Sequence, residues 1–296
     1  MGPGPWELGS CINQLTCDAS GLRLAAAGRG RLALFDARDG RPLVLMPGHG
    51  HVLDIDLSPD GRWVAAGCEG DEMYCLDAAS ASLVHGWKPE AAPRRGSQSV
   101  RFSRDGSALA IATSEPGIRI WRCADWSLRA LLRLRRPVRA LDWFPGGERL
   151  AVLTRDGVRV YRIEDRQVMA RVALAGAFDL VVSPEGTRVA VTDYDSGHVR
   201  VFGASLRRQE HALPLKNACR VRFSRDGRAL YGGSLDGAVL RWDLDHGARS
   251  TLLKPRGGGQ LHGLDVEPQS GTVFYGGPEG RIHTCGPRAL TAESES

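Results

Sequence analysis

A short turn motif recurs along the chain at nearly constant spacing, and it constrains the fold more than any other feature. Ser-Pro-Asp-Gly at 58–61 returns as Ser-Arg-Asp-Gly at 103–106 and 224–227, and as Ser-Pro-Glu-Gly at 183–186. Weaker copies stand at 18–21, 144–147 and 267–271, so the closing glycines of the seven copies are 39 to 45 residues apart. A constant period of this length indicates small structural units that stack against their neighbours.

Each repeat shows the same order of strands around this turn. An alternating apolar strand precedes the turn, as at 52–57, and a second strand follows, as at 63–67. A tight glycine-bearing turn such as Asp236-Gly237 leads to a third strand, and a weaker fourth strand ends the repeat. A period of about 40–45 residues is one four-stranded propeller blade. The sequence therefore predicts an all-β fold, a single seven-bladed β-propeller of four-stranded antiparallel blades.

The blade boundaries follow from the repeat. We expect the blades near 11–46, 52–87, 98–132, 137–172, 177–212, 218–253 and 261–286. The last of these offers only three strands, and its fourth is expected from the N-terminal segment 5–9, which would close the ring and remove exposed sheet edges. The alternative donor, 288–291, is less apolar. We expect one domain over 1–290 and a disordered tail over 291–296.

The repeats resemble those of the WD-repeat family. Phe35-Asp36, Leu76-Asp77 and Trp242-Asp243 look like the Trp-Asp signature of that family, and Gly48-His49 is similar to its Gly-His element. The resemblance implies a structural role for His49 and for three of the four members of the family's hydrogen-bond tetrad, namely Ser234, Asp236 and Trp242. Other blades depart from the pattern, since Trp121, Tyr161 and Phe202 are followed by Arg or Gly instead of Asp.

Composition narrows the cellular setting. The formal charge is +5, and only Lys88, Lys216 and Lys254 of the 39 cations are lysines. Such an arginine excess is typical of a GC-rich genome and suggests a bacterial origin, which weakens it as a sign of nucleic-acid binding. The seven cysteines are scattered, as expected for reduced thiols in the cytoplasm. The chain has no apolar run near the roughly 18–20 residues of a membrane helix, and its start does not look like a secretory signal. We expect a cytoplasmic protein without a membrane partner.

The inner strand of each blade should line the central channel, and its channel positions are unusually charged. Counting five residues back from each closing glycine, with one insertion allowed in the last repeat, gives Asp56, Arg101, Asp142, Arg222 and Asp265, beside the uncharged Thr16 and Val181. These charges can pair across neighbouring blades, or they can hold an ion or polar ligand on the axis. Pairing is favoured because a metal prefers acids without competing cations. No phosphate loop, zinc motif or nucleophile elbow is present, so neither catalytic residues nor a cofactor are predicted.

One face of the predicted ring should gather the loops between blades together with the hairpins between second and third strands. The long loop 85–98 carries an aromatic residue beside arginines, a combination typical of protein interfaces. The candidate partner-binding residues on this face are Trp87, Lys88, Arg94, Arg95, Arg135, Arg136, Lys216 and Arg256. Acidic hairpins on the same face give it a mixed charge, which suits a protein partner.

The predicted function is a non-enzymatic scaffold or adaptor that binds one or more proteins through this face and is monomeric by itself. The alternative is a hydrolase or lactonase-like propeller enzyme with its site in the channel. Nucleic-acid binding is the least favoured hypothesis, because the arginine-rich stretch Arg129–Arg139 alternates with leucines and lacks aromatic residues for base stacking.

Overall fold

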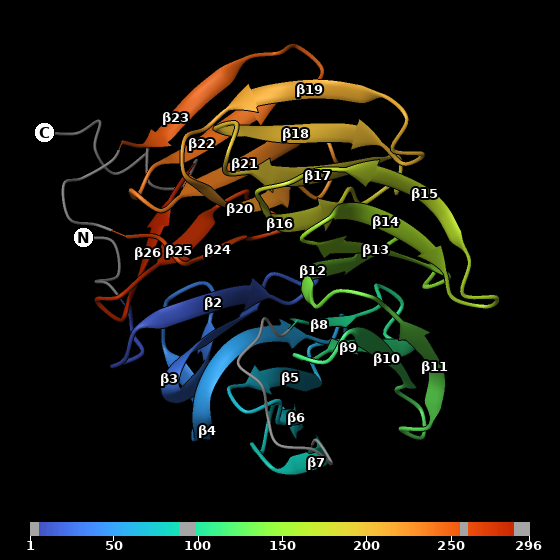
Figure 1. Ribbon diagram of the computed structural model, residues 1–296. Coiled ribbons are helices and arrows are strands. Elements are labelled where there is room, and N and C mark those ends of the chain that lie inside the picture. Colours follow the sequence, from blue (N-terminus) through green and yellow to red (C-terminus); the bar gives the residue numbers. More distant parts are fainter. Residues whose placement is uncertain (1–5, 89–98, 255–259, 287–296) are drawn as a thin grey trace, which may run out of the picture.

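The computed structural model describes residues 6–88, 99–254 and 260–286, with the side chains of 46–49 left aside. Every regular element within these ranges is a β-strand, and none is a helix, so no described segment could cross a membrane as a helix. The strands form seven groups arranged around one axis (Figure 1). This is the all-β propeller that the repeat predicts.

The strand bounds follow the repeat closely. Blade 1 contains β2 (Ile12–Cys17), β3 (Arg23–Asp36) and the first part of β4 (Pro42–Leu57). Blade 2 contains the rest of β4, β5 (Trp63–Cys68), β6 (Met73–Asp77) and β7 (Leu83–Trp87). Blade 3 contains β8 (Ser99–Phe102), β9 (Ala108–Ala112), β10 (Gly117–Arg122) and β11 (Leu128–Arg133). Blade 4 contains β12 (Val138–Trp143), β13 (Arg149–Thr154), β14 (Gly157–Arg162) and β15 (Val168–Ala173).

The remaining blades have the same order. Blade 5 contains β16 (Ala177–Val182), β17 (Arg188–Asp193), β18 (His198–Gly203) and β19 (Gln209–Pro214). Blade 6 contains β20 (Ala218–Phe223), β21 (Ala229–Ser234), β22 (Val239–Asp243) and β23 (Arg249–Leu253). Blade 7 contains β24 (Gly263–Val266), β25 (Val273–Gly276), β26 (Arg281–Cys285) and β1 (Trp6–Glu7).

Two strands of the first blades are unusually long because each one continues through a turn. β3 folds back at Gly30, which has φ +67°, and the amide of Ala37 then donates to the carbonyl of Leu22 over 2.9 Å. The first part of β4 pairs with β3, whereas its second part, from Val52 onward, pairs with β5. β4 therefore supplies the outer strand of blade 1 and the inner strand of blade 2, so the six-stranded sheet is two blades.

The ring closes where the two ends of the chain meet. Trp6 pairs with Ile282 and Glu7 pairs with Arg281, so the N-terminal segment supplies the fourth strand of blade 7, as predicted. Each inner strand contacts the next one around the axis, and β24 of blade 7 contacts β2 of blade 1. The ring thus has no open gap between its first and last blades.

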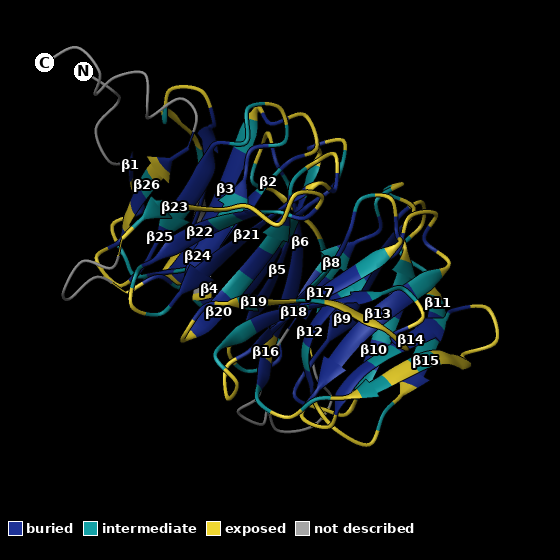
Figure 2. Cartoon of the chain, turned by 90° about the horizontal axis from the view of Figure 1, so that it is seen from above, coloured by how far each residue is buried: buried dark blue, intermediate teal, exposed yellow. Residues whose placement is uncertain are grey.

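The recurring turn has a chemical reason for its composition. The Ser58 hydroxyl donates to Asp60 over 2.6 Å and accepts the amide of Trp63 over 2.8 Å, and Gly61 takes a φ of +67° that disfavours a side chain. The same pair of bonds recurs at Ser103 and at Ser224. Apolar side chains between the turns fill the seams between blades, whereas the loops and turns are largely exposed (Figure 2).

Candidate interaction surface and axial channel

The loops between blades and the hairpins between second and third strands lie on one face, which we name the loop face. In blade 5 the amide of Tyr194, in the β17–β18 hairpin, donates to Gly176 of the preceding interblade loop over 3.1 Å. The amide of Leu215, in the next interblade loop, donates to Gly197 of the same hairpin over 3.0 Å. These backbone bonds hold the two kinds of loop side by side.

The predicted basic residues that the structure describes are exposed on this face. Lys88 is 3.3 Å from Glu72, Arg136 is 3.6 Å from Asp156, and Arg135 and Lys216 are also exposed. The remaining candidates, Arg94, Arg95 and Arg256, lie outside the described residues. Cations and hairpin acids therefore alternate over the loop face, so its charge is mixed.

Trp87 occupies a different setting from the open loop that the sequence suggests. It is the last residue of β7, partly buried in the seam between blades 2 and 3. Its ring lies 4.6 Å from His85, 5.3 Å from Trp121 and 5.7 Å from Trp126, measured between centroids. A cavity of about 500 Å³ lies beside Trp87 and Trp121. Trp87 thus belongs to an aromatic cluster and is less available to a partner than a loop residue would be.

Two aromatic residues that sequence reasoning missed are more exposed on the loop face. Phe178 is 53% exposed and Tyr194 is 44% exposed, and both belong to blade 5. Phe178 lies in a bulge of β16, where the register with β17 shifts, and a bulge can turn a side chain away from the core. A signal existed for Tyr194, since it is a lone aromatic residue in the polar turn Asp193–Gly197.

All five predicted channel charges line one axial cavity of about 410 Å³. Arg101 lies 2.7 Å from Asp54 of blade 2, and Arg222 lies 3.0 Å from Asp179 of blade 5 and 3.3 Å from Asp265 of blade 7. The arginines therefore pair with carboxylates of neighbouring blades. Sequence reasoning missed Asp54 and Asp179, although each lies on an inner strand two residues before a position counted as channel-lining.

The same carboxylates also bind the backbone of the next inner strand. Asp54 accepts the amide of Val100 over 3.0 Å, and Asp179 accepts the amide of Val221 over 3.1 Å. The three predicted acids do the same, each over 2.7 Å: Asp56 with Phe102, Asp142 with Val182, and Asp265 with Cys17. These five bonds connect blades 2 to 3, 4 to 5, 5 to 6 and 7 to 1.

Burial and neighbouring charges divide the channel carboxyls into two kinds. Burial raises the pKa of Asp56 to about 7, against the opposing effect of Arg101, and burial also raises the pKa of Asp265. Burial alone would raise the pKa of Asp179, but the guanidiniums of Arg222 and Arg220 bring that pKa below its usual value. Within the described ranges no group of three or more His, Cys, Asp or Glu side chains is arranged to hold a metal ion.

The tetrad implied by the family resemblance is only partly assembled. Ser234 and Asp236 are hydrogen-bonded through their side chains. Trp242 is buried, at 2% exposure, but its indole N–H is buried without a hydrogen-bond partner and so does not complete the network. The side chain of His49 lies outside the described residues. Packing, more than the tetrad, therefore fixes Trp242.

Comparisons with known proteins agree with the fold. A family model described as WD domain, G-beta repeat, matches residues 40–74. The small ribosomal subunit protein RACK1 of Caenorhabditis elegans is 26% identical over 40% of this chain and 42% of its own length. THO complex subunit 3 of Arabidopsis thaliana is 23% identical over 65% of this chain and 77% of its own length. The COMPASS component SWD3 of Saccharomyces cerevisiae is 23% identical over 74% of this chain and 62% of its own length.

Two of these matches span less than two thirds of the relative's length, namely 42% of the first relative and 62% of the third. For these two relatives the likeness covers only part of the protein. All three relatives come from eukaryotes, so they lend no support to the bacterial origin that the arginine excess suggests.

Proposed function

We propose that the chain is a WD-repeat protein and a non-enzymatic scaffold that binds a protein partner through its loop face. Each of the three relatives is named as a component of a larger assembly: a ribosomal subunit, the THO complex or COMPASS. A rigid ring with exposed loops suits such a role, although a fold alone does not identify the partner.

The observation that carries the proposal is the exposed aromatic pair of blade 5. Phe178 and Tyr194 are more than two fifths exposed, at 53% and 44%. The backbone bond between Tyr194 and Gly176 fixes the hairpin of Tyr194 against the loop that leads into Phe178. The exposed Lys216 lies close to the same hairpin. Its Cγ is 3.7 Å from the position that a Cβ on Gly197 would occupy. Aromatic anchors beside a charge are typical of the energetic centre of a protein interface.

The arrangement of the channel favours binding over catalysis. Asp54, Asp142 and Asp179 each accept a backbone amide of a neighbouring blade, so these carboxylates help to hold the ring together. A hydrolytic site would need convergent acids or histidines that are available to a substrate or metal.

All seven cysteines are free thiols, in keeping with the cytoplasmic setting that we propose.

Affinity capture with surface variants tests the proposal. Tagged protein with Phe178→Ser and Tyr194→Ser is compared with wild type in cells of the source organism, and captured proteins are quantified by mass spectrometry. We expect the main partner to be recovered at least about tenfold less, because anchor residues dominate interface energies. The matched control is Leu22→Ser with Leu43→Ser, which removes apolar groups of similar exposure, 50% and 40%, away from the loop face. Equal recovery with both pairs would contradict the loop-face assignment.

A further inference from the structure

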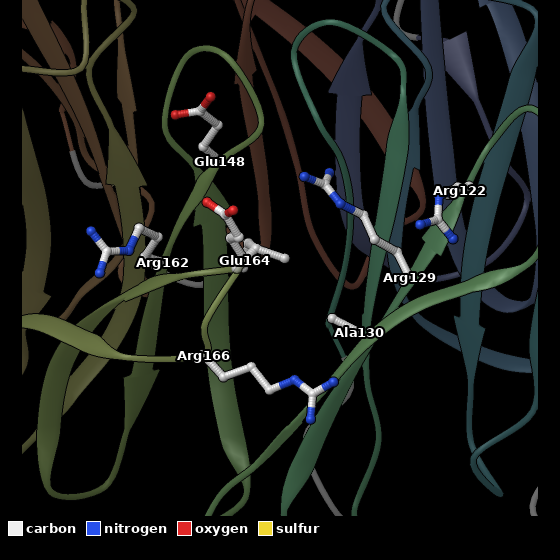
Figure 3. Close-up of a pocket in the computed structure, with 8 residues that line it drawn as sticks. Arg122, Arg129, Ala130, Glu148, Arg162, Glu164 and Arg166 are labelled. Atoms are coloured by element: carbon white, nitrogen blue, oxygen red, sulfur yellow. The ribbon is translucent and has the colours of Figure 1, made fainter.

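The outer edge of blade 3 carries a groove that lies away from the exposed aromatic pair of the loop face. Among the described residues, β11 is the last strand of its sheet and pairs only with β10, so no described strand covers its other backbone edge. Two hollows, of about 350 and 320 Å³, follow β11 between blades 3 and 4, and Arg166 lines both of them. Figure 3 shows the residues that line the first. We name this region the edge groove; its walls are formed chiefly by Arg122, Arg129, Leu131, Arg133, Tyr161 and Arg166.

Most of the positive charge in the edge groove is not neutralised within the described part of the chain. Arg162 is paired with Asp165, but Arg122, Arg129, Arg133 and Arg166 form no ion pair there. The nearest partners are neutral, since Arg122 donates to the Ser127 hydroxyl and Arg129 donates to the Gly147 carbonyl, each over 3.3 Å.

Two acids also line the first hollow, namely Glu148 and Glu164. Figure 3 shows their carboxylates directed away from the guanidinium of Arg166, which extends towards Ala130 of β11. Four unpaired arginines against two glutamates leave the edge groove with a positive balance, so it is complementary to an anionic ligand.

Arg166 takes the backbone conformation that recurs in this turn from blade to blade. Its φ is +62°, in the left-handed region that costs a residue with a side chain roughly 1–2 kcal/mol. The corresponding turns of blades 1 and 6 use Gly40 and Gly247 at positive φ. In blades 2 and 3 the residues in this conformation are Ala81 and Trp126, so a positive φ is a property of the turn and not of Arg166 alone. Arg166 is exposed at this turn.

The strand itself alternates in a way that suits an extended ligand. Ala130 and Leu132 of β11 are buried, Arg129 and Leu131 are half-buried, and Leu128 and Arg133 at the two ends are exposed, Leu128 at 48%. An open strand edge can pair with an added strand, with backbone hydrogen bonds giving affinity and side-chain hollows giving specificity. Tyr161, the aromatic residue among those walls, is only 8% exposed, so it presents little ring surface on which a nucleic-acid base could stack.

We propose that the edge groove binds an extended acidic segment of a partner protein, one in which glutamate or aspartate alternates with apolar residues, as a strand added beside β11. The acids would meet Arg129, Arg133 and Arg166, and the apolar residues would lie on the opposite face of the added strand, since successive residues of a strand point to opposite faces. This is a second docking site, independent of the loop face proposed above.

The test measures binding of a fluorescently labelled ten-residue peptide that alternates Glu and Val, by anisotropy with the full-length protein. We expect saturable binding that weakens steeply with salt and that falls at least about tenfold in the Arg129→Glu, Arg133→Glu variant. Arg166→Gly should also weaken binding while leaving the melting temperature unchanged or higher, which separates loss of the ligand contact from loss of fold. The matched control is Arg171→Glu, an exposed arginine on the neighbouring outer strand β15, and it should bind like wild type.

Three results would overturn the proposal: no saturable binding to wild type, equal binding to all variants, or tighter binding of a ten-nucleotide oligothymidine to the same arginines. The Phe178→Ser, Tyr194→Ser protein should bind the peptide normally. If the edge groove does not bind the peptide, the loop-face assignment is unaffected. If the loop-face variants capture the partner as wild type does, the edge-groove proposal is unaffected.

Discussion

The seam between blades 2 and 3 and the seam between blades 4 and 5 are alike near the axis and different at the rim. Near the axis, a carboxylate of one blade accepts an inner-strand amide of the next blade over 2.7 Å in both seams, Asp56 with Phe102 and Asp142 with Val182. At the rim, Phe202 fills the second seam among small aliphatic side chains and is 5% exposed.

The rim of the first seam is built from larger groups. Trp121, which stands next to last in the third strand as Phe202 does, meets Trp87 and His85 beside a cavity of about 500 Å³. Polar bonds at the axis therefore fix the spacing of the blades in both seams, and the outer side chains are free to vary. The two seams indicate that binding features can be added at the rim without changing the ring.

The largest expected effect removes an axial carboxylate. Asp54 accepts bonds from Arg101 over 2.7 Å, from Gln14 over 2.9 Å and from the amide of Val100 over 3.0 Å. Asp54→Ala should cost about 3–5 kcal/mol of unfolding free energy, because the buried guanidinium is left without its partner. Urea denaturation measures this cost. Asp39→Ala, at an exposed carboxyl, is the control and should change stability by less than about 0.5 kcal/mol.

The second prediction sets the two rims against each other. Phe202→Ala should cost about 3–4 kcal/mol, because it empties a closed apolar site. Trp121→Ala should cost only about 1–2 kcal/mol, because Trp121 already borders a cavity and buries less of its ring. The denaturant midpoints of the two variants, compared where both unfold with the same dependence on denaturant concentration, measure the two losses of stability. Equal losses of unfolding free energy in the two variants would mean that both rims are packed alike, which would contradict the difference between the two seams.

The third prediction concerns the pH dependence of the axis. Burial raises the pKa of Asp56 to about 7, whereas an unfolded chain has an aspartate pKa near 4. The folded chain therefore retains a proton that the unfolded chain loses, so Asp56 weakens folding increasingly as pH rises from about 4 to about 7. Asp56→Asn cannot ionise and should be about 1–2 kcal/mol more stable than wild type at pH 8, with no gain near pH 4. Urea titrations at both pH values measure this difference, and a variant less stable at pH 8 would contradict the account.

The smallest expected effect lies at the outer edge. Arg166→Gly relieves a positive φ and should leave the unfolding free energy unchanged or raise it by up to about 1 kcal/mol. Calorimetric melting measures the change, with Arg171→Gly as the control that should lower stability, since it places glycine within a strand. A clear loss of stability in Arg166→Gly would show that this side chain packs more firmly than its exposure indicates.

The repeat carries enough information to predict the ring, because period, turn chemistry and alternation all indicate the same blade. It also predicts the closing strand, since Trp6 offers the apolar group that packs against Phe274, 5.3 Å away between ring centroids. The channel positions Asp56, Arg101, Asp142, Arg222 and Asp265 follow from counting alone, because every inner strand is equivalent.

Features that depend on bulges and on long-range packing escape such counting. Asp54 and Asp179 reach the arginines from inner strands whose register shifts at a bulge, which a fixed offset does not represent. From the sequence Trp87 is expected in a loop, because its packing partner Trp121 is distant in sequence and the contact between them cannot be predicted from local pattern. The alternation of residues along its strand would place Phe178 in the core, yet the bulge in β16 leaves this side chain 53% exposed. The local sequence pattern predicts on which face of its strand a side chain lies, whereas the exposure of that side chain depends on how the neighbouring blade packs against it.

Hydrogen exchange of the ring with its purified partner tests the central claim most directly, because it maps contact without substitution. The account predicts that binding protects the amides of the interblade loop 174–178 and of the hairpin 193–197, while the turns at 58–61 and 183–186 on the other face exchange as before. Protection confined to those turns, or to the inner strands that line the channel, would contradict a scaffold that works through its loop face.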